Sequence, residues 1–152
     1  MAVESEMQCG HWRAALVTQS GNRRGTGSIR RGAVGIVRTL LNGDTALAEL
    51  AAIEDGGFAE AEAVLDGCAE SLILHRDGGA VRAWLNVCPH AGRRLDWAPG
   101  RFLKSKEGLL VCAVHGASFE LQRGECVAGS CRGDALRAVA VEVRDGAVFL
   151  AR

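Results

Sequence analysis

The sequence predicts an all-β protein, an antiparallel β-sandwich or small barrel, and three observations predict it. The chain has 152 residues, the length of one domain with some extra, and 48% of them are hydrophobic, which is enough to bury one core. From residue 58 onward, short apolar runs alternate with polar residues, as where Val139, Val141 and Val143 share one face of a strand. Glycine-containing turns separate these runs.

Seven segments are expected to form strands. In chain order they are FAEAEAV (58–64), ESLILHR (70–76), AVRAWLNV (80–87), GLLVC (108–112), ASFEL (117–121), RAVAVEV (137–143) and AVFLAR (147–152). The turns between them include DGG (77–79), QRGE (122–125) and RDG (144–146). Neighbouring strands joined by turns this short pair antiparallel. Only TALAELAAI (45–53) has a helical pattern, and a strand or an irregular entry fits that segment nearly as well.

The first 43 residues differ in composition from the rest of the chain. The stretch TQSGNRRGTGSIRRG (18–32) is rich in glycine, serine and arginine and has no apolar period, and a turn signal at Asn42-Gly43 follows it. We therefore expect residues 1–43 to be a disordered or loosely ordered N-terminal extension, and residues 44–152 to be the folded domain.

The charge of the whole chain gives no reason to expect nucleic acid or an anionic membrane as a partner. The formal net charge is zero, with 18 basic and 18 acidic residues. The charges are nevertheless segregated, because residues 1–43 carry six Arg against two Glu, residues 44–87 carry two basic against nine acidic residues, and residues 88–137 carry eight against five. The sequence has no uninterrupted run of 18 apolar residues, so no membrane-spanning helix is predicted. We expect a cytoplasmic protein.

Two loops each offer one cysteine and one histidine. The pattern is C-x-H at Cys88 and His90, then 21 residues, then C-x-x-H at Cys112 and His115. Thiolate and imidazole are the ligands of zinc and of iron–sulfur centres. A zinc finger has both cysteines early and both histidines late, whereas this interleaved order suits a binuclear cluster with both thiolates on one iron and both imidazoles on the other. A structural zinc site stays open as an alternative.

The residues around these motifs resemble the Rieske-type [2Fe–2S] ferredoxins. The resemblance covers about residues 45–152 and is carried by NVCPHAGRRLD (86–96), CAVHGASFE (112–120) and GECVAGSCRGDAL (124–136). Within that family, the chain is similar to the ferredoxin components of ring-hydroxylating dioxygenases and to the small subunit of nitrite reductase. It implies a Rieske-like antiparallel β-sandwich with a small cluster-binding subdomain. It also implies one [2Fe–2S] cluster, with Cys88 and Cys112 on the buried iron and His90 and His115 on the outer iron.

The function that this resemblance implies is electron transfer, with no catalytic residue in the chain. We expect a one-electron carrier between a flavoprotein or NADH-linked reductase and a terminal oxygenase or reductase. The alternatives are an accessory or redox-sensing Rieske subunit with no relay role, and a structural zinc-binding module. A basic rim for docking an acidic partner is expected from Arg93, Arg94, Arg101, Lys104, Lys106 and Arg132.

The second motif also bears on the reduction potential. In high-potential members of the family a serine and a tyrosine donate hydrogen bonds to the cluster and its ligands, and this chain has Ala117 and Phe119 at those places. Such donors stabilise the added electron, so their absence predicts a potential at the low end of the Rieske range, on the order of −150 mV. Cys126 and Cys131 could form a disulfide, but in a reducing compartment we expect them to pack as small apolar groups. We expect His75 to be an exposed or half-buried side chain without a role.

Overall fold

The computed structural model describes residues 45–151, so the predicted N-terminal extension lies outside the described residues. Within that range eleven strands form three antiparallel sheets, and the helical structure is one short 3-10 turn, η1 (Leu50–Ala52). The prediction of an all-β antiparallel fold is confirmed. No helix of the described part is long and apolar enough to span a bilayer.

The central sheet holds the longest strands. Its order is β2 (Phe58–Leu65), β3 (Cys68–Asp77), β4 (Ala80–Leu85) and β9 (Ala138–Val139), and every pair is antiparallel. Asp66 and Gly67 join β2 to β3 with φ angles of +51° and +81°. A two-residue hairpin turn of this kind needs positive φ at both positions, which an Asp-Gly pair adopts at low cost.

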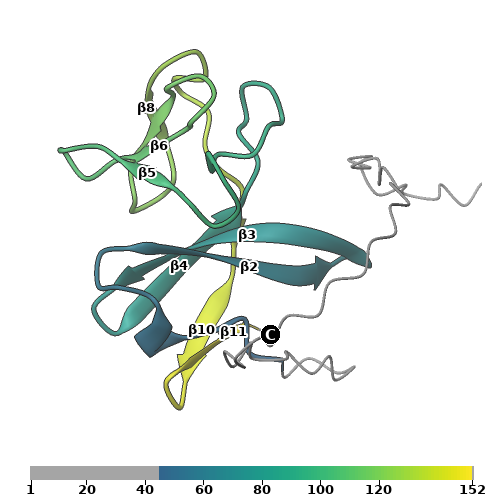
Figure 1. The fold of residues 1–152 in the computed structure, drawn as a ribbon. Helices are drawn as coiled ribbons and strands as arrows, with labels where there is room; N and C mark the ends of the chain where they lie inside the picture. The colour runs from purple at the N-terminus through teal and green to yellow at the C-terminus, as the bar shows by residue number, and fades with distance from the viewer. Residues whose placement is uncertain (1–44, 152) are drawn as a thin grey trace, which may run out of the picture. The chain divides into compact units, whose positions relative to one another are not determined.

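Two smaller sheets complete the molecule. One consists of β1 (Ala48–Glu49), β11 (Ala147–Leu150) and β10 (Val141–Arg144), in that order. The other consists of β5 (Leu103–Lys104), β6 (Leu110–Val111), β7 (Ser118–Phe119) and β8 (Cys126–Ala128). In Figure 1 the β2–β3–β4 strands lie between the labelled strands of these two groups. The β5–β8 sheet and the loops around it form the small subdomain that carries the two Cys/His motifs.

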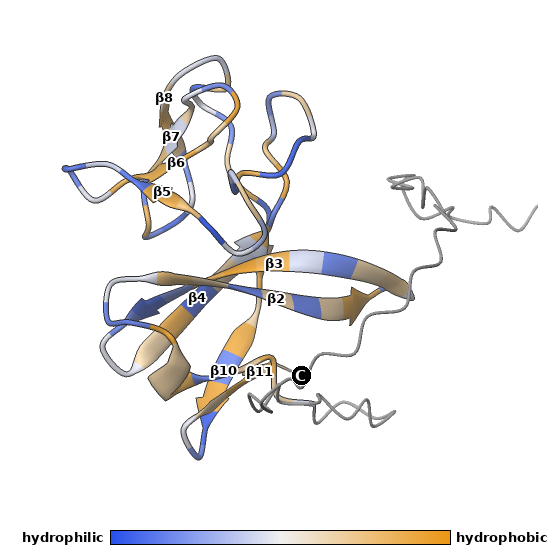
Figure 2. Cartoon of the chain, in the orientation of Figure 1, coloured by the Kyte–Doolittle hydropathy of each residue, from blue (hydrophilic) through white to orange (hydrophobic). Residues whose placement is uncertain are grey.

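The central sheet buries both of its faces. On one face Leu74 and Ala83 pack with hydrophobic residues of β1, β9 and β10. On the other face Ile73 and Trp84 pack against the small subdomain, where Leu95, Leu110 and Phe119 are fully buried. This explains why β3 contains the continuous apolar run LIL (72–74), since a strand covered on both faces has no polar side. Figure 2 shows the hydrophobic colour along the labelled part of β3.

The predicted strands differ from the observed ones mainly where strands are short. The segment 137–143 is divided at Ala140 into β9 and β10, which belong to different sheets and so carry the chain from one layer to the next. The segment 45–53 forms β1 and η1. Strands β5 and β8 were not predicted, because two or three residues are too few to show an alternation.

Candidate metal centre

The two motif loops close with the same backbone hydrogen bonds. In the first, the Gly92 amide donates to the Cys88 carbonyl at 2.8 Å, and the Cys88 amide donates to the Arg93 carbonyl at 2.7 Å. In the second, the Gly116 amide donates to the Cys112 carbonyl at 2.9 Å, and the Cys112 amide donates to the Ala117 carbonyl at 2.8 Å. Each loop therefore begins at its cysteine and turns back within five residues.

A glycine makes each of these turns possible. Gly92 has φ +64° and Gly116 has φ +69°, a left-handed conformation that other residues adopt only at a cost. The loops also contact each other, because the Ala113 amide donates to the Leu95 carbonyl at 3.0 Å. The sequence thus forms two equivalent turns side by side, each with its cysteine at the base.

The four motif side chains gather where the loops meet. The sulfurs of Cys88 and Cys112 and a ring nitrogen of His115 lie within 4.8 Å of one another. The Cys112 sulfur is 3.6 Å from His115 Nδ1. The His90 ring packs edge-on against the His115 ring, with 4.6 Å between centroids and 81° between planes. All four predicted ligands are therefore in one cluster of side chains.

Burial separates the thiols from the imidazoles. Cys88 and Cys112 are 0% and 1% exposed, whereas His115 is half-buried and His90 is exposed. Burial raises the pKa of the Cys88 thiol, so without a metal the protonated form is favoured, and binding a metal releases the proton. A donor set with two buried sulfurs and two outer nitrogens fits a [2Fe–2S] cluster that has one sulfur-bound and one nitrogen-bound iron.

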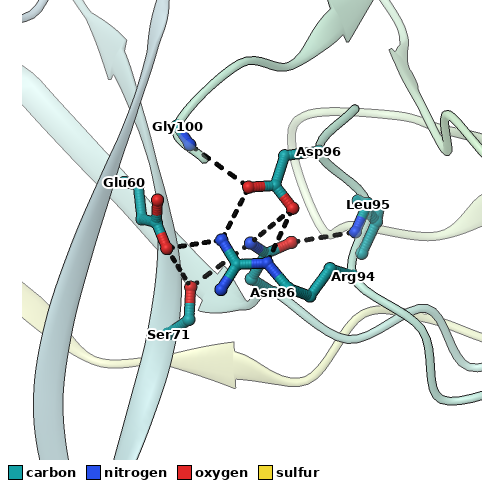
Figure 3. Close-up of polar contacts among 7 residues, drawn as sticks. All are labelled: Glu60, Ser71, Asn86, Arg94, Leu95, Asp96 and Gly100. Atoms are coloured by element: carbon teal, nitrogen blue, oxygen red, sulfur yellow. Dashed lines mark hydrogen bonds and ion pairs between the residues drawn. The ribbon is translucent and has the colours of Figure 1, made fainter. Parts of the chain in front are cut away.

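A polar network attaches the first loop to the central sheet. Asn86, 1% exposed, lies between β4 and Cys88, and its side-chain oxygen accepts the Leu95 amide at 2.9 Å. Its amide nitrogen donates to Asp96 Oδ1 and to Ser71 Oγ, each at 3.2 Å. Ser71 on β3 in turn donates to Glu60 on β2 at 2.8 Å. Both ends of the first loop are thereby fixed to strands β2 and β3 (Figure 3).

Arg94 completes the network with its guanidinium. It donates to both carboxylate oxygens of Asp96, at 2.9 and 2.6 Å, and it also pairs with Glu60 (Figure 3). The hydrogen bond to Asp96 raises the pKa of Arg94. Burial alone would raise the pKa of Asp96, but hydrogen bonds from Arg94 and Asn86 outweigh it and hold that pKa below its usual value. Asp96 is therefore a buried carboxylate at neutral pH.

A third segment, residues 126–131, packs beside the two motif cysteines. Cys126 and Cys131 are free thiols, each 3% exposed, in the same hydrophobic core as Cys88 and Cys112. Their sulfurs are 2.9 Å apart. Burial raises the pKa of Cys131 to about 12, and the adjacent Cys126 thiol acts in the same direction. Both cysteines are buried in the core, as the sequence predicted.

The predicted basic rim is smaller than the sequence suggests. Arg94 is held in the network described above, and Lys104 Nζ donates to the Gly56 carbonyl at 2.6 Å. The basic side chains of the rim that are exposed and carry no hydrogen bond or ion pair within residues 45–151 are Arg93, Arg101, Lys106 and Arg132. Sequence spacing could not separate Arg93 from Arg94, since the difference depends on Glu60, which lies 34 residues away.

The prediction that the His75 side chain is exposed or half-buried is wrong. Its side chain is 6% exposed and packs against the Phe58 ring at 5.1 Å between centroids. Neither ring nitrogen has a hydrogen-bond partner within the described residues. Because β3 is covered on both faces, a residue at its end is buried although the sequence there is polar. Desolvation and the charge of Lys104 lower the pKa of His75.

Comparison with known proteins agrees with this geometry. Residues 48–141 match the family model for the Rieske [2Fe-2S] domain. The structure is similar to the ferredoxin of carbazole 1,9a-dioxygenase from Nocardioides aromaticivorans IC177, with 26% identity and a TM-score of 0.55 over 70% of this chain and 94% of that one. A comparison with curated protein sequences gave no significant match.

Two further similar structures have lower identity, so they bear on the fold alone. The Sphingomonas yanoikuyae B1 ferredoxin matches with 21% identity and a TM-score of 0.51, over 70% of this chain and 96% of that one. The terminal oxygenase of carbazole 1,9a-dioxygenase from Novosphingobium sp. KA1 matches with 23% identity and a TM-score of 0.55, over 69% of this chain and 28% of that one. The prediction of a Rieske-like sandwich with a cluster-binding subdomain is confirmed.

Proposed function

The chain belongs to the Rieske [2Fe–2S] domain family and, on that premise, we propose that it is a soluble, cytoplasmic one-electron carrier. Its cofactor is one [2Fe–2S] cluster, which supplies reversible one-electron oxidation and reduction when bound. Cys88 and Cys112 hold the buried side of the cluster, and His90 and His115 hold the outer side. Residues 44–152 form the domain that does this work, and residues 1–43 precede it as an extension.

One observation carries the proposal, namely the difference in exposure along the donor set. The two thiols are 0% and 1% exposed, while His90 at the tip of the first loop is exposed and touches the half-buried His115 ring. The imidazoles therefore connect the buried side of the site to the molecular surface over one side-chain length. A partner that docks on this tip comes within a short electron-transfer distance, while the thiols stay shielded from water.

The surface around the tip suits docking. Val114 is 54% exposed and is the residue before His115, whose ring touches His90, so apolar area is available beside the imidazole pair. Arg93 and Arg132 add exposed positive charge close to the same loops. Apolar area supports a short-lived complex and positive charge speeds the encounter with an acidic partner.

We propose an oxygenase as the acceptor and a flavoprotein or NADH-linked reductase as the donor. The similar protein from Nocardioides aromaticivorans IC177 is described as the ferredoxin of carbazole 1,9a-dioxygenase, which supports the acceptor. The donor follows from the low potential expected of a second loop with Ala117 and Phe119. A low-potential carrier accepts electrons from a flavin or nicotinamide system more readily than from a quinol.

Rapid mixing of the reduced protein with the oxidised oxygenases and reductases of its source organism tests this function. We expect one of them to reoxidise the protein with one electron per chain, at a rate that falls as salt is raised. Arg93→Glu should slow that reaction several-fold. Arg144→Glu makes the same charge change on β10, in a different sheet, and should leave the rate almost unchanged.

A protein that responds to redox poise but gives its electron to none of these partners would contradict the relay function. That result would favour the accessory or redox-sensing subunit instead. Tightly held zinc in place of iron would contradict both.

A further inference from the structure

We propose that Cys126 and Cys131 form a reversible disulfide that lowers the reduction potential of the neighbouring cluster. The two sulfurs are 2.9 Å apart, and those of a disulfide are about 2.05 Å apart, so a movement of less than about 1 Å joins them. Five positions separate the two cysteines, and both are free thiols in the structure. Neither cysteine is one of the four predicted cluster ligands, Cys88, His90, Cys112 and His115.

The loop that joins the two cysteines holds them in this position. The Cys126 amide donates to the Asp134 carbonyl at 2.8 Å, and the Asp134 amide donates to the Cys131 carbonyl at 2.9 Å. Gly129, with φ +106°, lies so close to the second motif loop that an added Cβ would be 2.7 Å from Ala117 Cα. The pair is therefore built into the cover of the cluster site and is not formed by chance contact of mobile side chains.

A small disulfide can reach the pair from solvent. Cys131 itself is 3% exposed, but Gly129, Ser130, Arg132 and Gly133 around it are all exposed. An outward movement of this surface turn presents the thiol without unfolding the sheets. Glutathione disulfide is a suitable oxidant, because two protein S–H bonds break, one protein S–S bond forms, and the two electrons and two protons leave as two glutathione thiols.

The link to the cluster passes through Cys88. Cys131 and Cys88 lie in the same buried core cluster, and Cys131 acts to lower the pKa of the Cys88 thiol. A Cys88 thiolate that holds the cluster is a stronger acceptor than the Cys126 thiol, so in this proposal the Cys131 S–H donates to Cys88 once the cluster is bound. A hydrogen bond to a ligand sulfur stabilises the added electron. The disulfide has no S–H to donate, so its formation makes the cluster harder to reduce.

The test uses the full-length holoprotein in anaerobic glutathione buffers of increasing oxidised fraction. Samples are quenched with acid, unfolded, alkylated and digested with trypsin. Cleavage after Arg123 and Arg132 gives the peptide 124–132, which contains Cys126, Cys131 and no other cysteine. We expect this peptide to change in one step from two alkyl labels to none, with the loss of two hydrogen atoms. A peptide that carries two alkyl labels at every oxidised fraction of glutathione would overturn the proposal.

Two variants separate the disulfide from the hydrogen bond. Cys126→Ala keeps the Cys131 S–H but cannot form the disulfide. Its cluster midpoint potential should therefore equal that of the wild type with both thiols reduced, in every glutathione buffer. Cys131→Ala lacks both, and its midpoint should match the more negative value of the oxidised wild type. A wild-type midpoint that does not change when the disulfide forms would overturn the coupling. The thiol measurement needs no partner protein, so it stands apart from any failure of the carrier function.

Discussion

Arg93 and Arg94 are adjacent exposed arginines that differ in their partners. Arg94, whose side chain is 47% exposed, pairs with Glu60 and with Asp96, whose side chain is 2% exposed, whereas Arg93 has no ion pair within the described residues. Losing one partner of a buried ion pair leaves the other charge unpaired in a medium of low dielectric constant. The polar network therefore has a structural role at Arg94, and the neighbouring residue is free to act in docking.

Arg94→Gln should lower the stability of the protein by about 2 kcal/mol, because Asp96 stays buried without its strongest donor. Arg93→Gln is the matched control and should change stability by less than about 0.5 kcal/mol. Anaerobic denaturation of the holoproteins, followed by far-ultraviolet circular dichroism, measures both. Equal shifts for the two variants would show that the network does not hold the first loop.

The residue at position 117 bears on the potential. Ala117 is 0% exposed, and its carbonyl accepts the Cys112 amide, so its side chain lies within the second motif loop. Ala117→Ser should raise the midpoint potential, because a buried hydroxyl there can donate toward the cluster. Ala113→Ser places the same hydroxyl elsewhere in the loop and should have a smaller effect. Protein-film voltammetry gives both values, and a lower or unchanged midpoint for Ala117→Ser would contradict the account.

The lowered pKa of the buried His75 leads us to expect that the protein loses stability in acid. Desolvation, with Lys104 and Arg82, lowers its folded pKa, and Asp77 opposes them only in part. The unfolded chain, with its pKa near 6.5, then binds more protons than the folded chain. Stability is therefore complete above pH 6.5 and falls as the pH drops from there through the lowered folded pKa.

His75→Leu removes this titrating group, so the stability of the variant should fall less steeply below pH 6.5 than that of the wild type. Denaturant midpoints across a pH series measure the difference. Identical slopes of stability against pH for the two proteins would show that protonation of His75 does not destabilise the folded state.

At the scale of elements, glycine turns decide how the loops approach one another. Gly129 and Gly133 both have a strongly positive φ, +106° and +98°. A Cβ at Gly129 would lie 2.7 Å from Ala117 Cα, whereas a Cβ at Gly133 would meet nothing within 4 Å. The two positions share the backbone strain and differ in the contact.

Gly129→Ala should therefore destabilise the protein by about 2 kcal/mol more than Gly133→Ala. It should also speed the loss of the visible cluster absorbance, because the second motif loop has to move away from the added methyl group. Thermal denaturation and the bleaching rate check the two effects. Equal stability losses and equal bleaching rates for the two variants would mean that Gly129 does not lie in close contact with the second motif loop.

The long strands could be predicted from sequence and the short ones could not. β2, β3 and β4 have six to ten residues each, enough for alternation and turn signals to show. β5 and β8 have two and three residues, and they are strands only because β6 and β7 offer hydrogen-bond partners. The double burial of β3, and with it the burial of His75, depends on which segments pack on its two faces.

At the scale of the whole molecule, the four motif residues were predictable and their support was not. Cys88, His90, Cys112 and His115 stand out by type and spacing within two short stretches. Their supporting network joins residues 60, 71, 86, 94 and 96, which come from two strands and a loop. No local pattern connects positions so far apart, so only the folded chain shows that they form one unit.

The layers of the molecule explain how this unit serves the proposed function. The central sheet is the base of the molecule, with one face on the β1–β11–β10 sheet and the other on the cluster-binding subdomain. The two motif loops project from that subdomain with their thiols inward and His90 outward. In the proposed function, a partner meets the exposed tip while the packed sheets hold the thiols away from the surface.

The metal and acid-labile sulfide content of the anaerobically purified full-length protein is the decisive measurement for the proposed cluster. We expect about two irons and two sulfides per chain. We also expect Cys88→Ser and Cys112→Ser to lose both, since the buried thiolates are the proposed ligands. One zinc per chain with no sulfide, or a full complement of iron and sulfide in either variant, would contradict it.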